Sequence, residues 1–180
     1  MANCTCCSLL TWDYLKPSYY TPPRQDPRKA GGILLYNGQV LIVQSRGNKW
    51  GFPKGGFEPG ENATQCAQRE VQEETSLDVR FNEEDPQVRY KKTIFYVKYL
   101  HDKPSDISLV KIRTPGNDCT GIGWIRLSCL RKIVDPARRR RKPKNKQDDL
   151  VEGLEQLTLQ PMKFNLGLRN FVNKYMNTRR

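Results

Sequence analysis

Long apolar runs are missing from this chain of 180 residues, and its hydrophobic content is low. Hydrophobic residues make up 37% of the sequence, and the mean hydropathy is −0.75. Because no stretch approaches the length of a membrane span, we expect no membrane partner and no spanning segment. The opening stretch MANCTCCSLL is a poor match to a secretory signal peptide, since it lacks a basic segment followed by a long apolar one. The length predicts one domain with additional segments around it.

Residues of the usual zinc-binding type are also scarce. The chain has one histidine, His101, and six cysteines. The spacing of Cys4, Cys6 and Cys7 differs from the C-x2-C pattern of common zinc sites, so packed or surface thiols are the favoured interpretation. Without a secretory signal the thiols are expected to stay reduced, as in a protein of the cytoplasm or nucleus.

Negative charge is the third shortage. Nineteen Asp and Glu residues oppose 31 Lys and Arg, which gives a formal net charge of +12. An excess of this size indicates an anionic partner. By charge alone nucleic acid, a polyphosphate and an anionic membrane surface all qualify, and charge cannot choose between them. The densest basic stretch is ARRRRKPKNK at 137–146, whose composition is typical of a linker.

A helix is expected from Asn62 to Thr75, and it carries several of the few acidic residues. Asn62 is a favourable N-cap, and Gln65, three residues later, can complete a capping box. No Gly or Pro interrupts the following residues. At helical spacing Glu70 and Glu74 continue the stripe of small apolar residues that begins upstream.

The carboxylates of this helix are placed unfavourably unless a cation neutralises them. Glu70 and Glu74 repel each other at a spacing of four residues, on a face whose pattern predicts burial. Glu73 lies at the edge of that face, and both Glu73 and Glu74 occupy the last turn, where the helix dipole disfavours anions. A divalent cation would reverse all three effects. The alternative for REVQEE (69–74) alone is a solvated acidic helix end.

The stretch GGFEPGENATQCAQREVQEETSL, residues 55–77, favours the cation. Its spacing resembles the Nudix box, G-x5-E-x7-R-E-U-x-E-E-x-G-U, in which U is aliphatic. Every defined position from Gly55 to Leu77 matches except one, because Ser76 stands where the family has Gly. We expect Ser76 to end the helix in a left-handed conformation, at a cost of roughly 1 kcal/mol.

The resemblance implies an α/β fold, an α/β/α sandwich built on a mixed sheet with C-terminal helices added. The Nudix domain is expected over 29–134, after an N-terminal extension at 1–28. A basic linker at 135–148 and a C-terminal helical segment at 149–180 would follow it.

Several runs predict elements of such a fold. The Asn-Gly dipeptide at 37–38 predicts a hairpin. The other expectations are strands at 31–36, 39–45, 88–100 and 108–113, a loop at 46–61, a strand passing into a short helix at 121–134, and helices near 150–157 and 164–175.

The resemblance also implies a reaction, the Mg2+- or Mn2+-dependent cleavage of a nucleoside diphosphate linked to another group. The metal ligands implied are Glu70, Glu73 and Glu74, together with the carbonyl of Gly55; such hard cations prefer oxygen ligands. The box also implies supporting roles for Glu61 and Arg69, whose planar guanidinium would fix a carboxylate.

Two neighbouring stretches resemble different branches of the family. WGFPKG (50–55) resembles the entry to the box in eukaryotic and viral mRNA decapping enzymes, in which a Lys such as Lys54 precedes the first Gly. GGFEPGE (55–61) resembles diphosphoinositol polyphosphate phosphohydrolases. Decapping enzymes also carry an acidic general base shortly before a Trp-containing strand, which implies that role for Asp118, six residues before Trp124. The alternative for Asp118 is a polar turn residue.

Substrate contacts are expected from basic and aromatic residues around the box and from the basic run. Trp50 could stack on a base, although an aromatic residue at this place is also typical of a core. The basic run suits an RNA backbone, and equally a nuclear localisation signal, an inositol-phosphate clamp or a solubilising linker. The candidates are Arg46, Lys49, Trp50, Lys54, Arg138, Arg139, Arg140 and Arg141.

Three functions remain open at this stage. The first is an mRNA decapping hydrolase that releases m7GDP from capped RNA. The second is a hydrolase of diphosphoinositol polyphosphates or dinucleoside polyphosphates. The third is a catalytically silent RNA-binding module, which the intact REVQEE disfavours because such a module has no need of unpaired acids on a buried stripe.

Overall fold

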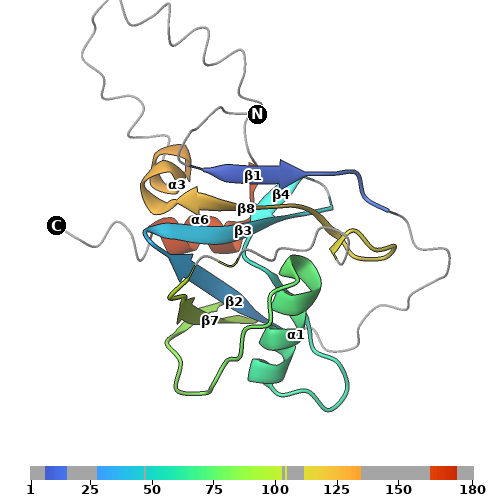
Figure 1. Ribbon diagram of the computed structural model, residues 1–180. Coiled ribbons are helices and arrows are strands. Elements are labelled where there is room, and N and C mark those ends of the chain that lie inside the picture. The colour runs from blue at the N-terminus through green and yellow to red at the C-terminus, as the bar shows by residue number, and fades with distance from the viewer. Residues whose placement is uncertain are drawn as a thin grey trace, which may run out of the picture.

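The computed structural model describes residues 7–15, 28–46, 48–102, 104, 112–134 and 163–173. They form one mixed sheet with helices on both faces (Figure 1). The elements in chain order are β1 Ser8–Thr11, β2 Lys29–Tyr36, β3 Gln39–Ser45, β4 Lys49–Gly51, β5 Lys54–Gly56, α1 Ala63–Thr75, β6 Gln87–Tyr90, β7 Thr93–Tyr99, β8 Cys119–Arg126, α3 Leu127–Val134, β9 Lys163–Phe164 and α6 Leu166–Phe171.

The sheet has the strand order β1-β8-β3-β2-β7-β6, and β4 and β5 pair with β3 and β2 beside this path. The pairs β2–β7 and β4–β9 are parallel, and the other described pairs are antiparallel. The sheet is therefore mixed, as expected. β2 lies at its centre and contacts α1, β3, β5 and β7.

Successive core residues of the central strands point to opposite faces of the sheet. On one face Leu34 of β2 belongs to a core cluster that includes Val71 of α1. On the other face Ile33 of the same strand packs in a second cluster with Leu130 of α3 and Leu168 of α6. The molecule thus has three layers, with α1 on one side and α3 and α6 on the other. The predicted α/β/α sandwich is confirmed.

Turn chemistry explains which sequence predictions hold. Asn37 and Gly38 have φ of 42° and 71°, so the predicted hairpin between β2 and β3 is confirmed. The single strand expected at 88–100 is wrong, because Lys91 takes φ 51° and a tight turn divides the run into β6 and β7. The expected loop at 46–61 also needs correction, since it contains the short strands β4 and β5.

The remaining elements agree with the sequence in part. β8 passes directly into α3, as predicted for 121–134, and α6 lies within the predicted helical stretch 164–175. Of the expected strand at 108–113 only the last two residues are described, and Ile112 has a helical backbone there. The helix expected near 150–157 lies outside the described residues.

β1 is an element that the sequence did not predict. It pairs antiparallel with β8 along Ser8 to Thr11. Gly121 and Gly123 of β8 make this approach possible, because a Cβ at Gly123 would collide with the carbonyl oxygen of Ser8. Part of the segment expected to be an extension is therefore an edge strand of the sheet.

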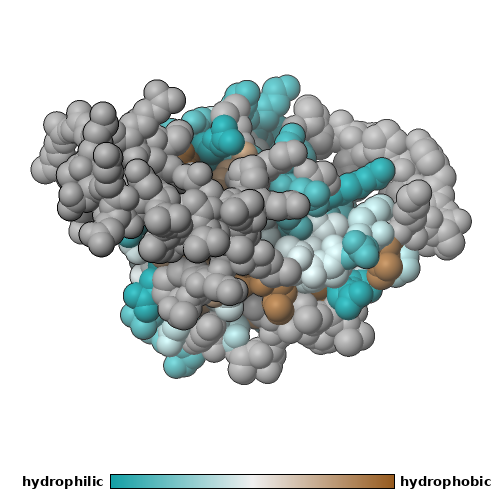
Figure 2. Space-filling model, turned by 90° about the horizontal axis from the view of Figure 1, so that it is seen from above, coloured by the Kyte–Doolittle hydropathy of each residue, from teal (hydrophilic) through white to brown (hydrophobic). Residues whose placement is uncertain are grey.

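The described surface is mostly hydrophilic where it is visible from above (Figure 2). The large hydrophobic side chains exposed among the described residues are scattered at Leu10, Leu15 and Tyr99. Within the same residues no helix has the length and apolar character needed to span a membrane.

Candidate active site

The helix α1 positions the acidic residues, and both of its ends are built as the sequence predicts. The Asn62 side chain accepts a hydrogen bond from the Gln65 amide at 2.9 Å, and the Gln65 side chain accepts one from the Asn62 amide at 2.9 Å. Ser76 ends the helix with φ 60°, and its amide donates to the Gln72 carbonyl at 2.8 Å. The capping box and the left-handed Ser76 are confirmed.

Two carboxylates of α1 are buried against the strand that precedes it. Glu70 is 4% exposed and Glu74 is 6% exposed, as the stripe pattern predicts. The Glu70 carboxylate lies directly on Gly55, and a Cβ at this position would force the carboxylate to move. Glu74 accepts a hydrogen bond from the Lys54 amide at 2.9 Å. The β5 backbone and the α1 carboxylates thus form one contact surface.

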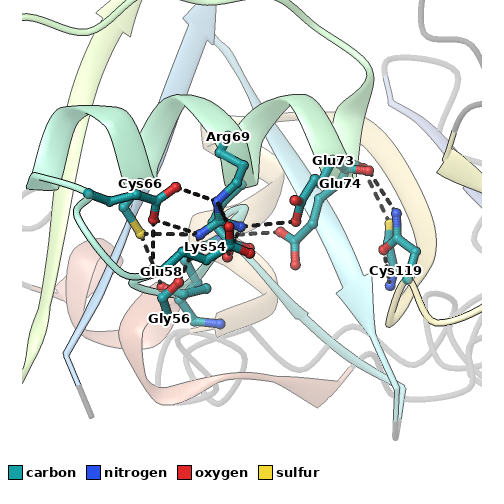
Figure 3. Close-up of polar contacts among 12 residues, drawn as sticks. Lys54, Gly56, Glu58, Cys66, Arg69, Glu73, Glu74 and Cys119 are labelled. Carbon is teal, nitrogen blue, oxygen red and sulfur yellow. Dashed lines mark hydrogen bonds and ion pairs between the residues drawn. The ribbon is translucent and has the colours of Figure 1, made fainter. Parts of the chain in front are cut away.

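Arg69 ties the acidic residues together (Figure 3). Its Nε and Nη2 donate to the two carboxylate oxygens of Glu61 at 2.6 and 3.0 Å, which is the fork geometry that the resemblance implies. Its Nη1 contacts Glu70 at 2.8 Å and Glu73 at 3.2 Å. The hydrogen bond from Arg69 lowers the pKa of Glu61, so this carboxylate stays charged and holds the guanidinium in place.

The surroundings of Glu74 raise its pKa, whereas those of Glu61 lower its pKa. Burial raises the pKa of Glu74 well above the usual range, and the negative charge of Asp118 raises it further. The nearby Lys54 charge and the Lys54 amide act against this rise without cancelling it. The arrangement therefore disfavours a charged Glu74 unless a cation joins it.

The segment 116–120, a loop that leads into the first two residues of β8, fastens Asp118 to the end of α1. The Asn117 side chain donates to the Glu73 carbonyl at 2.7 Å and accepts from the Cys119 amide at 3.0 Å. The Cys119 thiol donates to the Glu74 carbonyl at 3.4 Å. Asp118, itself exposed, lies close enough to the buried Glu74 carboxylate for its charge to act on it.

Asn117 and Cys119 are site residues that sequence reasoning missed. They contact backbone carbonyls of α1, and no motif spacing reports such contacts. Burial raises the pKa of the Cys119 thiol, so it acts as a hydrogen-bond donor and not as a nucleophile. Cys66 is similar: burial raises its pKa to about 11, and its thiol donates to the Gly55 carbonyl at 3.7 Å.

The donors present fit a hard divalent cation. The carboxylates of Glu70 and Glu74 are buried, Glu70 against Gly55 and Glu74 against the Lys54 amide, and the Lys54 charge offsets the effect of burial on Glu74 only in part. Oxygen donors of this kind suit Mg2+ or Mn2+. Among the described residues no three His, Cys, Asp or Glu side chains already stand in coordinating geometry, and Glu73 is 46% exposed and turned to Arg69.

The other residues expected to contact substrate are distributed unevenly. Lys54 is half-buried beside Glu74, and Arg46 and Lys49 are exposed. Trp50 is 4% exposed and lies in the core, which favours the packing interpretation over stacking on a base. The basic residues Arg138 to Arg141 lie outside the described part of the chain.

Comparison with known proteins identifies the family. The NUDIX domain model matches residues 26–144. The protein named "Putative hydrolase 111R" of Invertebrate iridescent virus 3 is 35% identical over 131 residues, which cover 71% of this chain and 76% of that protein. Nudix hydrolase 2 of Arabidopsis thaliana is 30% identical over 86 residues, 39% of this chain and 31% of that protein.

Solved structures give matches as well. A binary complex of an Ap4A hydrolase from C. elegans matches with a TM-score of 0.47 and 21% identity, over 72% of this chain and 97% of that one. The family model and the viral relative together show that the chain belongs to the Nudix family. It is a Nudix pyrophosphohydrolase, an enzyme of a family whose members generally use divalent metals.

Proposed function

We propose that this hydrolase removes the 5′ cap of RNA in a reaction that depends on Mg2+ or Mn2+. Water would attack phosphorus, the phosphoanhydride bond would break, and the products would be m7GDP and RNA with a 5′ monophosphate. The observation that carries the hydrolytic part is the pair of buried carboxylates, Glu70 and Glu74, packed on the backbone of Lys54 and Gly55.

The proposed roles follow from the contacts. Glu70, Glu73, Glu74 and the Gly55 carbonyl would hold the cation, and Arg69 would orient the carboxylates through the contacts it already makes. The chemistry that a bound Mg2+ or Mn2+ supplies is neutralisation of phosphate charge and activation of a water molecule. Glu61, kept charged by Arg69, holds the guanidinium in place, which would preserve the carboxylate geometry through the reaction.

Asp118 is proposed as the general base. The residues on either side of it are bonded to the last turn of α1. Asn117 donates to the Glu73 carbonyl and Cys119 donates to the Glu74 carbonyl, and these bonds fix the position of Asp118 relative to the helix. Its carboxylate would take the proton of the attacking water. Lys54, next to Glu74, would contact a phosphate of the substrate.

The preference for capped RNA rests on charge and on the WGFPKG stretch. The net charge of +12 favours a polyanion larger than a nucleotide, and the run 137–146 offers a strip of cations for an RNA backbone. We place the activity in the cytoplasm, with the nucleus as the alternative if the run is a localisation signal. A non-catalytic RNA-binding module is disfavoured, because it would have no reason to bury Glu70 and Glu74.

A second candidate is the hydrolysis of diphosphoinositol polyphosphates or dinucleoside polyphosphates. The observation that favours it is the exposed turn at Glu58–Gly60 in the GGFEPGE stretch. Gly60 takes φ 84°, and the Glu58 amide donates to Glu61 at 2.8 Å, so this turn is joined to the Glu61–Arg69 pair. An insert at this place can contact a compact polyphosphate.

A parallel assay separates the candidates. Cap-labelled RNA, a diphosphoinositol polyphosphate, diadenosine polyphosphates and nucleoside triphosphates would each be incubated with the full chain and Mg2+ or Mn2+. Release of m7GDP with the highest kcat/KM for capped RNA supports decapping. A higher kcat/KM for either class of small polyphosphate would assign the protein to the second candidate. Hydrolysis of none, with tight RNA binding, would favour the silent module.

A further inference from the structure

The N-terminal segment reaches the active-site loop. After β1 the backbone amide of Trp12 donates to the Thr120 carbonyl at 2.7 Å, and its indole Nε1 donates to the Cys119 carbonyl at 3.1 Å. The Leu15 carbonyl accepts a hydrogen bond from the Gly116 amide at 3.1 Å. Residues 12–15 are therefore bonded along the loop that carries Asp118, and Tyr14 lies between these anchors.

Tyr14 meets an arginine from a distant part of the chain. The guanidinium of Arg46 lies over the Tyr14 ring, 5.0 Å from its centroid. Arg46 directly follows β3, and its amide donates to the Asp118 carbonyl at 2.8 Å. Three segments therefore meet here, because Arg46 at the end of β3 stacks its guanidinium on Tyr14 of the N-terminal segment and is bonded through its main chain to Asp118.

The Arg46 side chain is available to a ligand. It is exposed, and none of the ion pairs among the described residues involves it. An arginine stacked on an aromatic ring loses less freedom when it binds, and its planar edge still offers donors to two oxygens of one phosphate. The family domain match begins at residue 26, so Tyr14 lies outside the matched domain.

We propose that Arg46, held by Tyr14, is a phosphate-binding subsite beside the catalytic centre. It takes a phosphate of the substrate outside the bond that is cleaved, and it thereby selects substrates that extend past Asp118. This inference rests on the proposed hydrolytic function. The phosphate belongs either to the polyphosphate bridge or to the RNA backbone downstream of the cap, and the length of the substrate distinguishes these two sources.

Two pairs of variants isolate the chemistry. Arg46→Met removes the charge and the donors, whereas Arg46→Lys keeps the charge without the planar fork. Tyr14→Leu removes the ring face, whereas Tyr14→Phe keeps it. Arg126→Met is the matched control, because Arg126 is an exposed arginine at the opposite end of β8 from Cys119. Main-chain bonds of Arg46 are unaffected in its variants, and thermal melting verifies that each variant is folded.

The kinetic result expected is a change in KM. Arg46→Met raises KM about tenfold, the loss expected for a charge-assisted hydrogen bond, with kcat within about twofold of wild type. Arg46→Lys recovers part of this loss. Tyr14→Leu raises KM about threefold, because the guanidinium is no longer held, and Tyr14→Phe and Arg126→Met leave KM unchanged. If KM rises for capped RNA and not for a cap dinucleotide, the phosphate belongs to the RNA backbone; a rise for both assigns it to the bridge.

Binding without turnover separates this inference from the proposed function. Fluorescence anisotropy of a labelled capped RNA 12-mer in EDTA gives the salt slope, which flattens by about 0.7 in Arg46→Met if one phosphate contact on a single strand is lost. The change in salt slope is expected even if the RNA is never hydrolysed. Competition by inorganic tripolyphosphate provides the corresponding test for a contact with the polyphosphate bridge. An unchanged KM and salt slope in Arg46→Met would overturn the subsite. The subsite would also be overturned if Arg46→Met changed kcat alone. The same holds if the effect of Arg46→Met depended on the adjacent nucleobase and Arg46→Lys did not restore part of the loss.

Discussion

Glu74 is the residue at which burial and charge oppose each other most directly. Its carboxyl is buried, Asp118 adds negative charge beside it, and its pKa is raised well above the usual range. A carboxyl group whose pKa is higher in the folded than in the unfolded state destabilises the folded protein when it loses its proton. In the metal-free protein the free energy of unfolding therefore falls as pH rises above the unfolded pKa of Glu74, because the unfolded chain then holds fewer protons.

The variant Glu74→Gln tests this at the same position. Gln keeps an oxygen for the Lys54 amide and removes the ionisable group. We expect the metal-free variant to be more stable than wild type at neutral pH, by about 1 kcal/mol or more, and the difference to vanish near pH 4. Urea titrations in EDTA at several pH values measure it. A variant that is less stable than wild type at every pH would point to a structural ion pair instead.

Asp118 is the second residue whose role can be separated by kinetics. Asp118→Asn retains the shape of the side chain and the main-chain bond to Arg46, and removes the proton acceptor. We expect kcat to fall by about 100-fold, the usual contribution of a general base, with a much smaller change in KM. The dependence of kcat on pH, measured on its acid and its alkaline side for wild type and Asp118→Asn, provides a further readout. If kcat is unchanged, the base is elsewhere, and the next acids to test are Glu152 and Glu155 of the C-terminal segment 149–180, which lie outside the described residues.

At the scale of elements, the end of α1 carries the one departure from the family box. Ser76 holds a left-handed conformation that glycine adopts without a steric penalty. Ser76→Gly should raise the free energy of unfolding by roughly 0.5–1 kcal/mol and leave kcat unchanged. Gln72→Gly in the interior of the same helix is the control, and it should lower stability by about 1 kcal/mol. A destabilised Ser76→Gly would show that the serine side chain itself supports the turn.

The elements also show what a sequence can and cannot predict. Asn37-Gly38 and the Asn62–Gln65 box act through neighbours in the chain, so the hairpin and the start of α1 followed from the sequence. β1 depends on space left by Gly121 and Gly123, which lie more than a hundred residues away in the sequence. β4 and β5 have three residues each, too few for a period to be visible.

The residues of the active site also divide into those that the sequence could predict and those that it could not. Motif spacing located the two buried carboxylates and Arg69, because one helix carries all of them. Asn117 and Cys119 bind main-chain carbonyls across a long sequence separation, and the Tyr14–Arg46 pair joins two distant segments. Only the folded chain brings such groups together, and their residue types carry no signal of it. Trp50 was ambiguous for a related reason, since an aromatic residue suits a core and a stacking surface equally.

At the scale of the whole molecule, the basic run is predicted to follow RNA. Replacing Arg138 to Arg141 with Ser should weaken affinity similarly for all RNA sequences and flatten the salt slope by up to about 0.7 per lost contact. Hydrolysis of a cap dinucleotide should hardly change, because it is too short to reach the run. Anisotropy at several salt concentrations and initial rates on both substrates measure these effects. Unchanged RNA binding with failed nuclear import would make the run a localisation signal, and a collapse of diphosphoinositol turnover would make it a small-ligand clamp.

The central claim is that the carboxylates of α1 hold a divalent cation for phosphoanhydride hydrolysis. The most direct measurement is the rate of hydrolysis against Mg2+ and Mn2+ concentration for wild type, Glu73→Gln and Glu74→Gln, with folding verified by circular dichroism. We predict saturable dependence on the metal in wild type and a loss of turnover by orders of magnitude, at least about 100-fold, in both folded variants. Hydrolysis close to the wild-type rate by both variants, with either metal, would contradict the account.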